Sequence, residues 1–129
     1  MKIINEENYV DFAEGVIGKL IFTDRNGKKK VNLSTSKIRS ILAMSAELYN
    51  EVLLLESEKL DKNLLSRLDY LRIRMLYDAG REPKKVKKFI EEAKLLEIIK
   101  SITTKKEYIL FYHYMEALVA FHKYNGGED

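Results

Sequence analysis

Five side chains on one predicted helix combine two kinds of binding chemistry on a shared face. They are Arg67, Tyr70, Arg74, Tyr77 and Arg81, and each position is three or four residues after the one before it. At 100° per residue they fall within an arc of roughly 80°. Guanidinium groups can hold phosphates, and flat aromatic rings can stack on bases. This Arg/Tyr stripe therefore indicates a nucleic-acid-binding surface, unless the tyrosines pack against neighbouring helices and the arginines lie along them in solvent.

Basic residues also cluster at three other places. Lys37 and Arg39 lie in the first turn of the second predicted helix, where free backbone N–H groups and the helix dipole favour an anion. A lysine-rich corner leads into the fourth predicted helix, and one more lysine lies near the end of the last. The corner begins at Arg81, the last residue of the stripe, and continues with Lys84, Lys85, Lys87 and Lys88. The lysine of the last helix is Lys123. Such runs are usually solvated faces, but here they continue from the stripe and favour a track for a polyanion.

The elements that must position these side chains are predicted to be helices. One proline and six glycines in 129 residues leave few breaks, which favours long helices. Apolar residues recur at helical spacing in five segments, and potential capping residues precede several of them. We therefore expect an all-α protein, a compact bundle of about five helices. Their approximate ranges are 6–18, 34–55, 61–81, 84–100 and 104–124.

The stretch between the first two helices has a different character. Asn26-Gly27, placed between Ile21-Phe22 and Val31-Leu33, could close a two-residue β-hairpin. The triple lysine at 28–30 argues equally for a mobile segment. We adopt the second interpretation and expect a long basic loop, with the small hairpin as the alternative.

The last predicted helix carries more apolar surface than a helix on the protein surface needs. Between Tyr108 and Phe121, only His113 and Glu116 interrupt a run of apolar or aromatic residues. A helix that is apolar all round must be covered on every side. It is therefore either the central helix or partly covered by another subunit. Ile73, opposite the core face of the third helix, also suggests a partner.

The chain offers little for catalysis or metal binding. It has no cysteine, and its two histidines, His113 and His122, lie about 180° apart on one helix, so they cannot chelate one metal ion. It has neither a glycine-rich phosphate loop nor a nucleophilic serine elbow. We expect no enzyme activity, no metal and no cofactor.

Length and composition set the remaining expectations. The 129 residues suit one domain, in which 1–33 form the N-terminal helix and basic loop and 34–127 form the core helices. No apolar run approaches the ~20 residues of a membrane span, and the first residues lack the apolar run of a signal peptide. We expect a soluble cytoplasmic protein without a membrane partner. The net charge of +3 is small, so any basic surface must come from local clustering.

Three motifs follow one another on the predicted helices. They are Ser36-Lys-Ile-Arg39, then Tyr70-Leu-Arg-Ile-Arg74 continuing through Tyr77 to Gly80-Arg81, and the ending Tyr114-Met-Glu-Ala-Leu-Val-Ala-Phe-His-Lys-Tyr-Asn-Gly-Gly127. In this order they resemble the small helical subunit of type III-A CRISPR effector complexes, the Csm small subunit. The resemblance covers about Leu33 to Gly127.

The resemblance implies a non-catalytic, all-helical RNA-binding subunit of a ribonucleoprotein complex that serves antiviral defence. Such subunits stack in an interior filament along the guide–target RNA duplex. The implied partners are guide RNA, target RNA, other subunits of the effector complex and further copies of the chain. The residues at the family's basic motif positions, implied as RNA contacts, are Lys37, Arg39, Arg74, Arg81 and Lys123. We add Arg67 from the stripe alone, and Lys84 and Lys85 from the lysine-rich corner.

Two other functions stay open. The first is a structural helical adaptor whose basic residues only keep it soluble. The second, a DNA-binding regulator, is weaker, because the long segment before the second helix is not the tight turn of a helix-turn-helix motif. Arginines alternating with tyrosines fit the backbone of a single strand or of an A-form duplex better.

Overall fold

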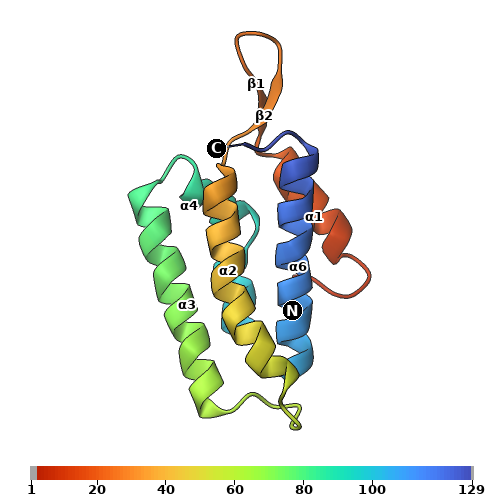
Figure 1. The fold of residues 1–129 in the computed structure, drawn as a ribbon, viewed down its shortest axis with the longest axis vertical. Helices are drawn as coiled ribbons and strands as arrows, with labels where there is room; N and C mark the ends of the chain where they lie inside the picture. The colour runs from red at the N-terminus through yellow and green to blue at the C-terminus, as the bar shows by residue number, and fades with distance from the viewer. Residues whose placement is uncertain (1–2, 129) are drawn as a thin grey trace.

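A computed structural model describes residues 3–128; residues 1, 2 and 129, which the predicted domain includes, lie outside the described part. The described residues form six α-helices and two short β-strands (Figure 1). The broad expectation of an all-α protein is therefore confirmed. The helices are α1 (Tyr9–Gly18), α2 (Thr35–Leu53), α3 (Lys62–Arg81), α4 (Val86–Glu92), α5 (Leu95–Ser101) and α6 (Lys105–Tyr124). The strands are β1 (Ile21–Thr23) and β2 (Lys29–Val31).

Three helices begin at side-chain caps, in line with the potential capping residues in the sequence. Ser34 before α2 and Asp61 before α3 each accept a hydrogen bond from the backbone N–H three residues later, at 3.3 and 2.9 Å. Thr104 and Glu107 form the reciprocal capping box expected for the last helix. These caps satisfy N–H groups that the first turn of a helix leaves without partners.

The expected fourth helix is two helices, which corrects the prediction of five. Between α4 and α5, Lys94 adopts a left-handed backbone conformation with φ of 56°. The turn buries Leu95 fully, and the Tyr114 hydroxyl donates a 2.8 Å hydrogen bond to the Ala93 carbonyl at the break. Full burial of one leucine contributes about 1.5–3 kcal/mol, which offsets the ~1–2 kcal/mol cost of a left-handed non-glycine residue.

The segment expected as a long basic loop is a β-hairpin, so that expectation was wrong. β1 and β2 pair antiparallel with Ile21 opposite Val31, and Val31 is buried. The connection is a three-residue loop rather than a two-residue turn, because the Asp24 N–H donates to the Lys28 carbonyl at 2.9 Å. Gly27 supplies the left-handed residue that this type of loop needs, with φ of 77°.

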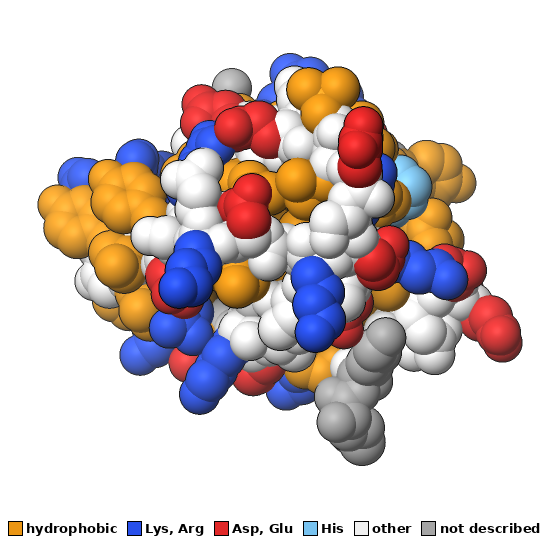
Figure 2. Space-filling model, turned by 90° about the horizontal axis from the view of Figure 1, so that it is seen from below, with side chains coloured by type: hydrophobic (Ala, Val, Ile, Leu, Met, Phe, Trp, Pro, Cys, Tyr) orange, Lys and Arg blue, Asp and Glu red, His pale blue; other side chains and the backbone are white. Residues whose placement is uncertain are grey.

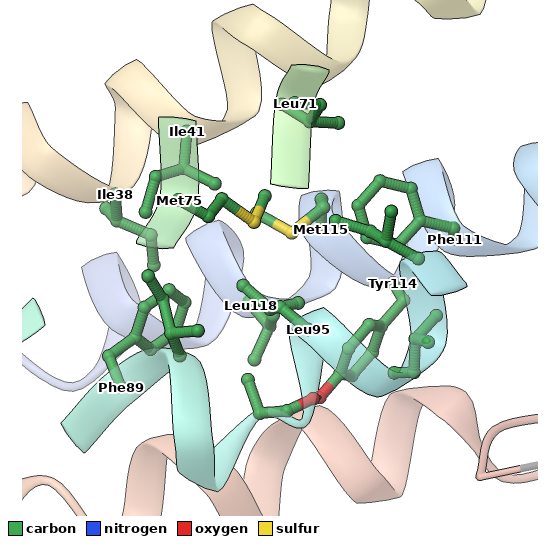
Figure 3. Close-up of a cluster of buried hydrophobic side chains, with 14 of the residues drawn as sticks. Ile38, Ile41, Leu71, Met75, Phe89, Leu95, Phe111, Tyr114, Met115 and Leu118 are labelled. Carbon is green, nitrogen blue, oxygen red and sulfur yellow. The ribbon is translucent and has the colours of Figure 1, made fainter. Parts of the chain in front are cut away.

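The apolar α6 is the central helix. It packs against both α1 and α2 (Figure 1). Figure 3 shows side chains from α2, α3, α4 and α5 converging on its inner face. The buried Tyr108 hydroxyl donates to the Ser45 carbonyl at 2.6 Å, so its polar atom is satisfied. His113 and Glu116, the two residues that interrupt the apolar run, are exposed. Central burial accounts for most of the apolar run.

Candidate nucleic-acid interface

One end of the bundle brings together basic residues from several elements. α2 begins there, α3 and α6 end there, and the β1–β2 hairpin projects from the same end (Figure 1). The Lys37 ammonium lies 3.1 Å from a Glu82 carboxylate oxygen, and the Asn32 side-chain amide donates to the Lys84 carbonyl at 3.3 Å. We call this region the basic end. Its candidate side chains are Lys37, Arg39, Arg81, Lys84, Lys85 and Lys123.

The two basic residues at the start of α2 differ in their surroundings. Lys37 is ion-paired with Glu82, the residue directly after α3. Arg39 is exposed and forms no ion pair within residues 3–128. Surface ion pairs contribute at most about 1 kcal/mol, so Lys37 can exchange Glu82 for another anion at little cost. Arg39 needs no such exchange.

The tyrosines of the Arg/Tyr stripe face solvent. Tyr70 is 59% exposed and Tyr77 62%, so the alternative in which they pack against neighbouring helices is wrong. Arg74 and Arg81 are exposed as well, and the Arg81 guanidinium carbon lies 5.7 Å from the centroid of the Tyr77 ring, a cation–π distance. The opposite face of α3 is the core face, as predicted: Leu64, Leu68, Leu71, Met75 and Ala79 are buried.

Arg67 lies apart from the basic end. It is near the start of α3, where its guanidinium is ion-paired with Glu51 of α2. With Tyr70 and Arg74 it lines a groove of about 330 Å³ between α2 and α3, to which Glu47 also contributes. Carboxylates on the α2 side therefore surround this arginine. The fold places Arg67 in the same groove as Arg74 but away from the candidates of the basic end.

The lysine-rich corner and the end of α6 complete the basic end. Lys84 and Lys85 are exposed in the turn between α3 and α4, and Lys85 directly precedes α4. Lys123 is exposed in the last turn of α6, next to Tyr124, which is 86% exposed. These residues come from elements far apart in the sequence, so helical spacing alone could not show that they share one end.

Three further cations at this end were not among the predicted site residues. Arg25, Lys28 and Lys29 are exposed on the hairpin and form no ion pair within the described part of the chain. They fall in the segment expected to be a basic loop, with the small hairpin as the alternative. The signal that could have placed them is Asp24 two residues before Asn26-Gly27, between two apolar segments, which is typical of a hairpin.

The outer face of α3 adds apolar surface beside the stripe. Ile73 is 57% exposed and Leu76 52%, close in sequence to the exposed Tyr70 and Tyr77. Figure 2 shows hydrophobic side chains projecting at the left-hand edge, the side on which Figure 1 places α3. Within residues 3–128, no other element covers this face. Contiguous exposed apolar surface of this kind is typical of a protein contact.

The titratable groups of the core have structural partners. His122 is buried, with Nε2 2.6 Å from the Leu33 carbonyl oxygen. Burial raises the pKa of the Tyr108 and Tyr114 phenols, which therefore stay protonated and donate hydrogen bonds. No group of three or more acidic or histidine side chains suited to a metal ion lies between residues 3 and 128. Over the same residues, none of the helices has the length and apolar character needed to cross a bilayer.

Fold and surface together define a small helical protein with a basic end and an Arg/Tyr stripe on its outer helix. Residues 22–128 match the family described as Csm2 Type III-A, a range that includes most of the hairpin and all of α2 to α6. The chain belongs to the Csm2 family of type III-A CRISPR complexes. This confirms the resemblance found in the sequence.

Three relatives with the name CRISPR system Cms protein Csm2 illustrate the similarity. The relative from Streptococcus thermophilus is 40% identical over 129 residues, which cover 100% of both chains. One from Mycobacterium tuberculosis is 35% identical over 125 residues, 96% of each chain. One from Enterococcus italicus is 32% identical over 108 residues, 78% of this chain and 76% of the relative. None of these names assigns an enzymatic activity. Membership of the family makes other subunits of the Csm complex partners of this chain.

Proposed function

We propose that the chain is a non-catalytic RNA-binding subunit that stacks in the interior filament of the type III-A complex. The basic end contacts the phosphate backbone of the guide–target RNA duplex, and the complex serves antiviral interference. The observation that carries this proposal is the convergence of exposed cations from α2, α3, the following corner and α6 at one end. Arg39, Arg81, Lys84 and Lys123 are all exposed there.

The chemistry of these side chains favours contact with the backbone rather than with base edges. A guanidinium group such as that of Arg39 or Arg81 can donate two parallel hydrogen bonds to the oxygens of one phosphate, and lysine ammonium groups add positive charge. The exposed rings of Tyr70 and Tyr77 can stack on a base of any identity. Phosphate contacts position a protein but carry no sequence information. The proposed binding is therefore independent of RNA sequence.

Stacking is supported by the outer face of α3. Ile73 and Leu76 are exposed there without a partner from the described residues. We assign this face to a contact with the next subunit of the filament, which buries apolar surface that a free monomer leaves in water. The same face favours a second candidate function, a structural adaptor that joins other subunits without binding RNA.

The salt dependence of RNA affinity separates the candidates. The full-length protein is titrated with single-stranded uridine RNA, with an RNA duplex and with duplex DNA at several salt concentrations. RNA binding predicts a steep fall of affinity with salt, with a log–log slope of about −0.7 for each phosphate contacted on a single strand. A folded protein without RNA binding at low salt supports the adaptor. Duplex DNA that outcompetes RNA at equal salt supports a DNA-binding regulator.

A further inference from the structure

The β1–β2 hairpin carries none of the cations on which the proposed function rests. It projects beyond the helices from the basic end (Figure 1). Four of its residues are basic, Arg25 and the three lysines at 28–30. Its base lies against the candidate surface, because Asn32, directly after β2, donates its side-chain amide to the Lys84 carbonyl at 3.3 Å.

Contacts at both ends of the hairpin fix its shape. In the loop, one Asp24 carboxylate oxygen accepts the N–H groups of Asn26 and Lys28, each at 2.9 Å. At the base, the Lys30 ammonium lies 2.9 Å from a Glu128 carboxylate oxygen and 3.7 Å from one of Asp24. The Glu128 carbonyl in turn accepts the Thr35 N–H at the start of α2, at 3.3 Å. The hairpin is thus tied to α2 and to the chain beyond α6.

These contacts leave an unequal distribution of charge. Lys30 forms ion pairs with both nearby carboxylates, Asp24 and Glu128. Arg25, Lys28 and Lys29 remain exposed, and none of the three forms an ion pair with another residue between 3 and 128. Lys28 interacts electrostatically with Asp24 and Glu128, but none of the three cations is held in an ion pair with a residue between 3 and 128. Exposed cations on a narrow, ordered ribbon produce a positive potential that favours a polyanion over a single small anion. Phe22 on β1 is 45% exposed and lies opposite Lys30 in the strand pairing.

We propose that the β1–β2 hairpin is an additional RNA-backbone contact, in which Arg25, Lys28 and Lys29 bind phosphodiester groups. It extends the track of the basic end past the helices, along the same strand that Lys84 and Arg81 contact. This inference rests on the proposed RNA-binding function. It adds residues that helical periodicity cannot identify, since they lie on a ribbon and not on a helix.

The test compares two triple charge reversals in the full-length protein. One variant combines Arg25→Glu, Lys28→Glu and Lys29→Glu. The control combines Lys59→Glu, Lys62→Glu and Lys100→Glu, three exposed lysines outside the basic end, so both variants change the net charge equally. The hairpin substitutions leave the Asp24 loop hydrogen bonds intact, because these use backbone N–H groups. Circular dichroism and the thermal midpoint check that both variants fold.

Single-stranded uridine RNA is the probe, over a range of salt. The hairpin variant is expected to lose about tenfold or more in affinity at low salt, and its log–log salt slope is expected to flatten by about 2, since three contacts at about 0.7 each are removed. The control variant is expected to keep the wild-type slope. Equal losses in the two variants overturn the hairpin inference, because the effect then follows net charge alone.

A second comparison separates failure of this inference from failure of the proposed function. If wild type binds RNA, and Arg74→Glu with Arg81→Glu lowers its affinity about tenfold or more while the hairpin variant binds as tightly as wild type, the hairpin inference is wrong and the function stands. If folded wild type does not bind RNA at low salt, the proposed function itself is wrong. Photo-crosslinking of thiouridine-containing RNA provides an independent readout, with adducts expected within residues 22–30.

Discussion

The Nε2 atom of His122 lies 2.6 Å from the carbonyl oxygen of Leu33, a contact between the last turn of α6 and the segment that leads from the hairpin into α2. A carbonyl oxygen can only accept, so Nε2 carries the proton. His122 is 1% exposed, and both groups are shielded from water. This one hydrogen bond therefore joins two of the elements that carry the candidate cations.

Replacing His122 by Ala is expected to loosen the basic end. The substitution leaves the buried Leu33 carbonyl without its donor, which costs about 1–3 kcal/mol of unfolding free energy before any cavity is counted. Chemical denaturation measures the effect. The matched control is His113→Ala on the same helix, where the side chain is exposed and the expected change is within about 0.5 kcal/mol. Equal stability of the two variants would show that the contact with Leu33 contributes nothing.

Gly127→Ala is expected to release the chain beyond α6. A Cβ at this position would lie 2.1 Å from His122 Cε1, closer than any real contact, and the Gly127 N–H already donates to the His122 carbonyl at 2.8 Å. The segment must move, and Glu128 then leaves Lys30. We expect a loss of about 1–3 kcal/mol and faster amide hydrogen exchange in the hairpin.

Gly15→Ala in α1 is the control for that substitution. A Cβ there meets no atom within 4 Å, and alanine is a better helix residue than glycine, so stability is expected to rise by about 0.5–1 kcal/mol. If Gly127→Ala is as stable as wild type and the hairpin amides are equally protected, the proposed packing around His122 is contradicted.

Arg67→Ala tests whether an arginine chosen by helical spacing alone contributes as much to RNA binding as a residue of the basic end. Arg67 is ion-paired with Glu51 on the surface, and such pairs contribute about 0–1 kcal/mol, so stability is expected to change little. Because Arg67 is ion-paired and lies away from the basic end, RNA affinity is expected to fall by less than in Arg81→Ala. Fluorescence anisotropy with labelled RNA provides the comparison. A larger loss for Arg67→Ala would place the RNA in the α2–α3 groove instead.

The hairpin is expected to open in acid. The hydrogen bond to Lys30 lowers the pKa of Glu128 below its ordinary 4.5, and the Lys28 N–H lowers the pKa of Asp24 below its ordinary 3.8. A carboxyl group whose pKa is depressed by folding stabilises the folded state above its unfolded pKa. That contribution is lost as pH falls through the folded pKa. Stabilisation is therefore complete at neutral pH.

NMR chemical shifts of residues 24–30 follow this transition. We expect them to move toward disordered values below the pKa values of Glu128 and Asp24, while the signals of α2 and α6 persist. Glu128→Gln keeps a hydrogen-bond acceptor but removes the charge, so part of the change is expected already at neutral pH. Unchanged hairpin shifts in acid would mean that these two carboxylates do not hold the hairpin.

Local signals made much of the fold predictable. Caps such as Asp61 and Thr104 act on N–H groups within their own helical turn, so they can be identified without knowledge of the tertiary structure. The break at Lys94 could not be found this way. It depends on Leu95 filling the core and on Tyr114 of α6 reaching the Ala93 carbonyl. The hairpin was only the alternative to a loop, because its lysines favoured a mobile segment, whereas the burial of Val31 and the Asp24 hydrogen bonds order it.

The candidate site was predictable in part for the same reason. The spacing of three and four residues showed which residues of α3 share a face. It could not show that no other helix covers Tyr70 and Tyr77, which are exposed to solvent. The position of Lys123 at the same end of the bundle as the lysine-rich corner follows from the direction in which α6 crosses the bundle (Figure 1). Arg67 fits the stripe by angle, yet its pairing with Glu51 depends on the packing of α2 against α3.

RNA affinity of the variant carrying Arg74→Glu with Arg81→Glu tests the central claim most directly. The control carries Lys59→Glu with Lys62→Glu, an equal change of charge at exposed positions outside the basic end. We predict that the arginine variant loses about tenfold or more in affinity at low salt, that its salt slope flattens by about 1.4, and that its helicity is unchanged. An arginine variant that binds RNA as tightly as the control, with the same salt slope, would contradict the account.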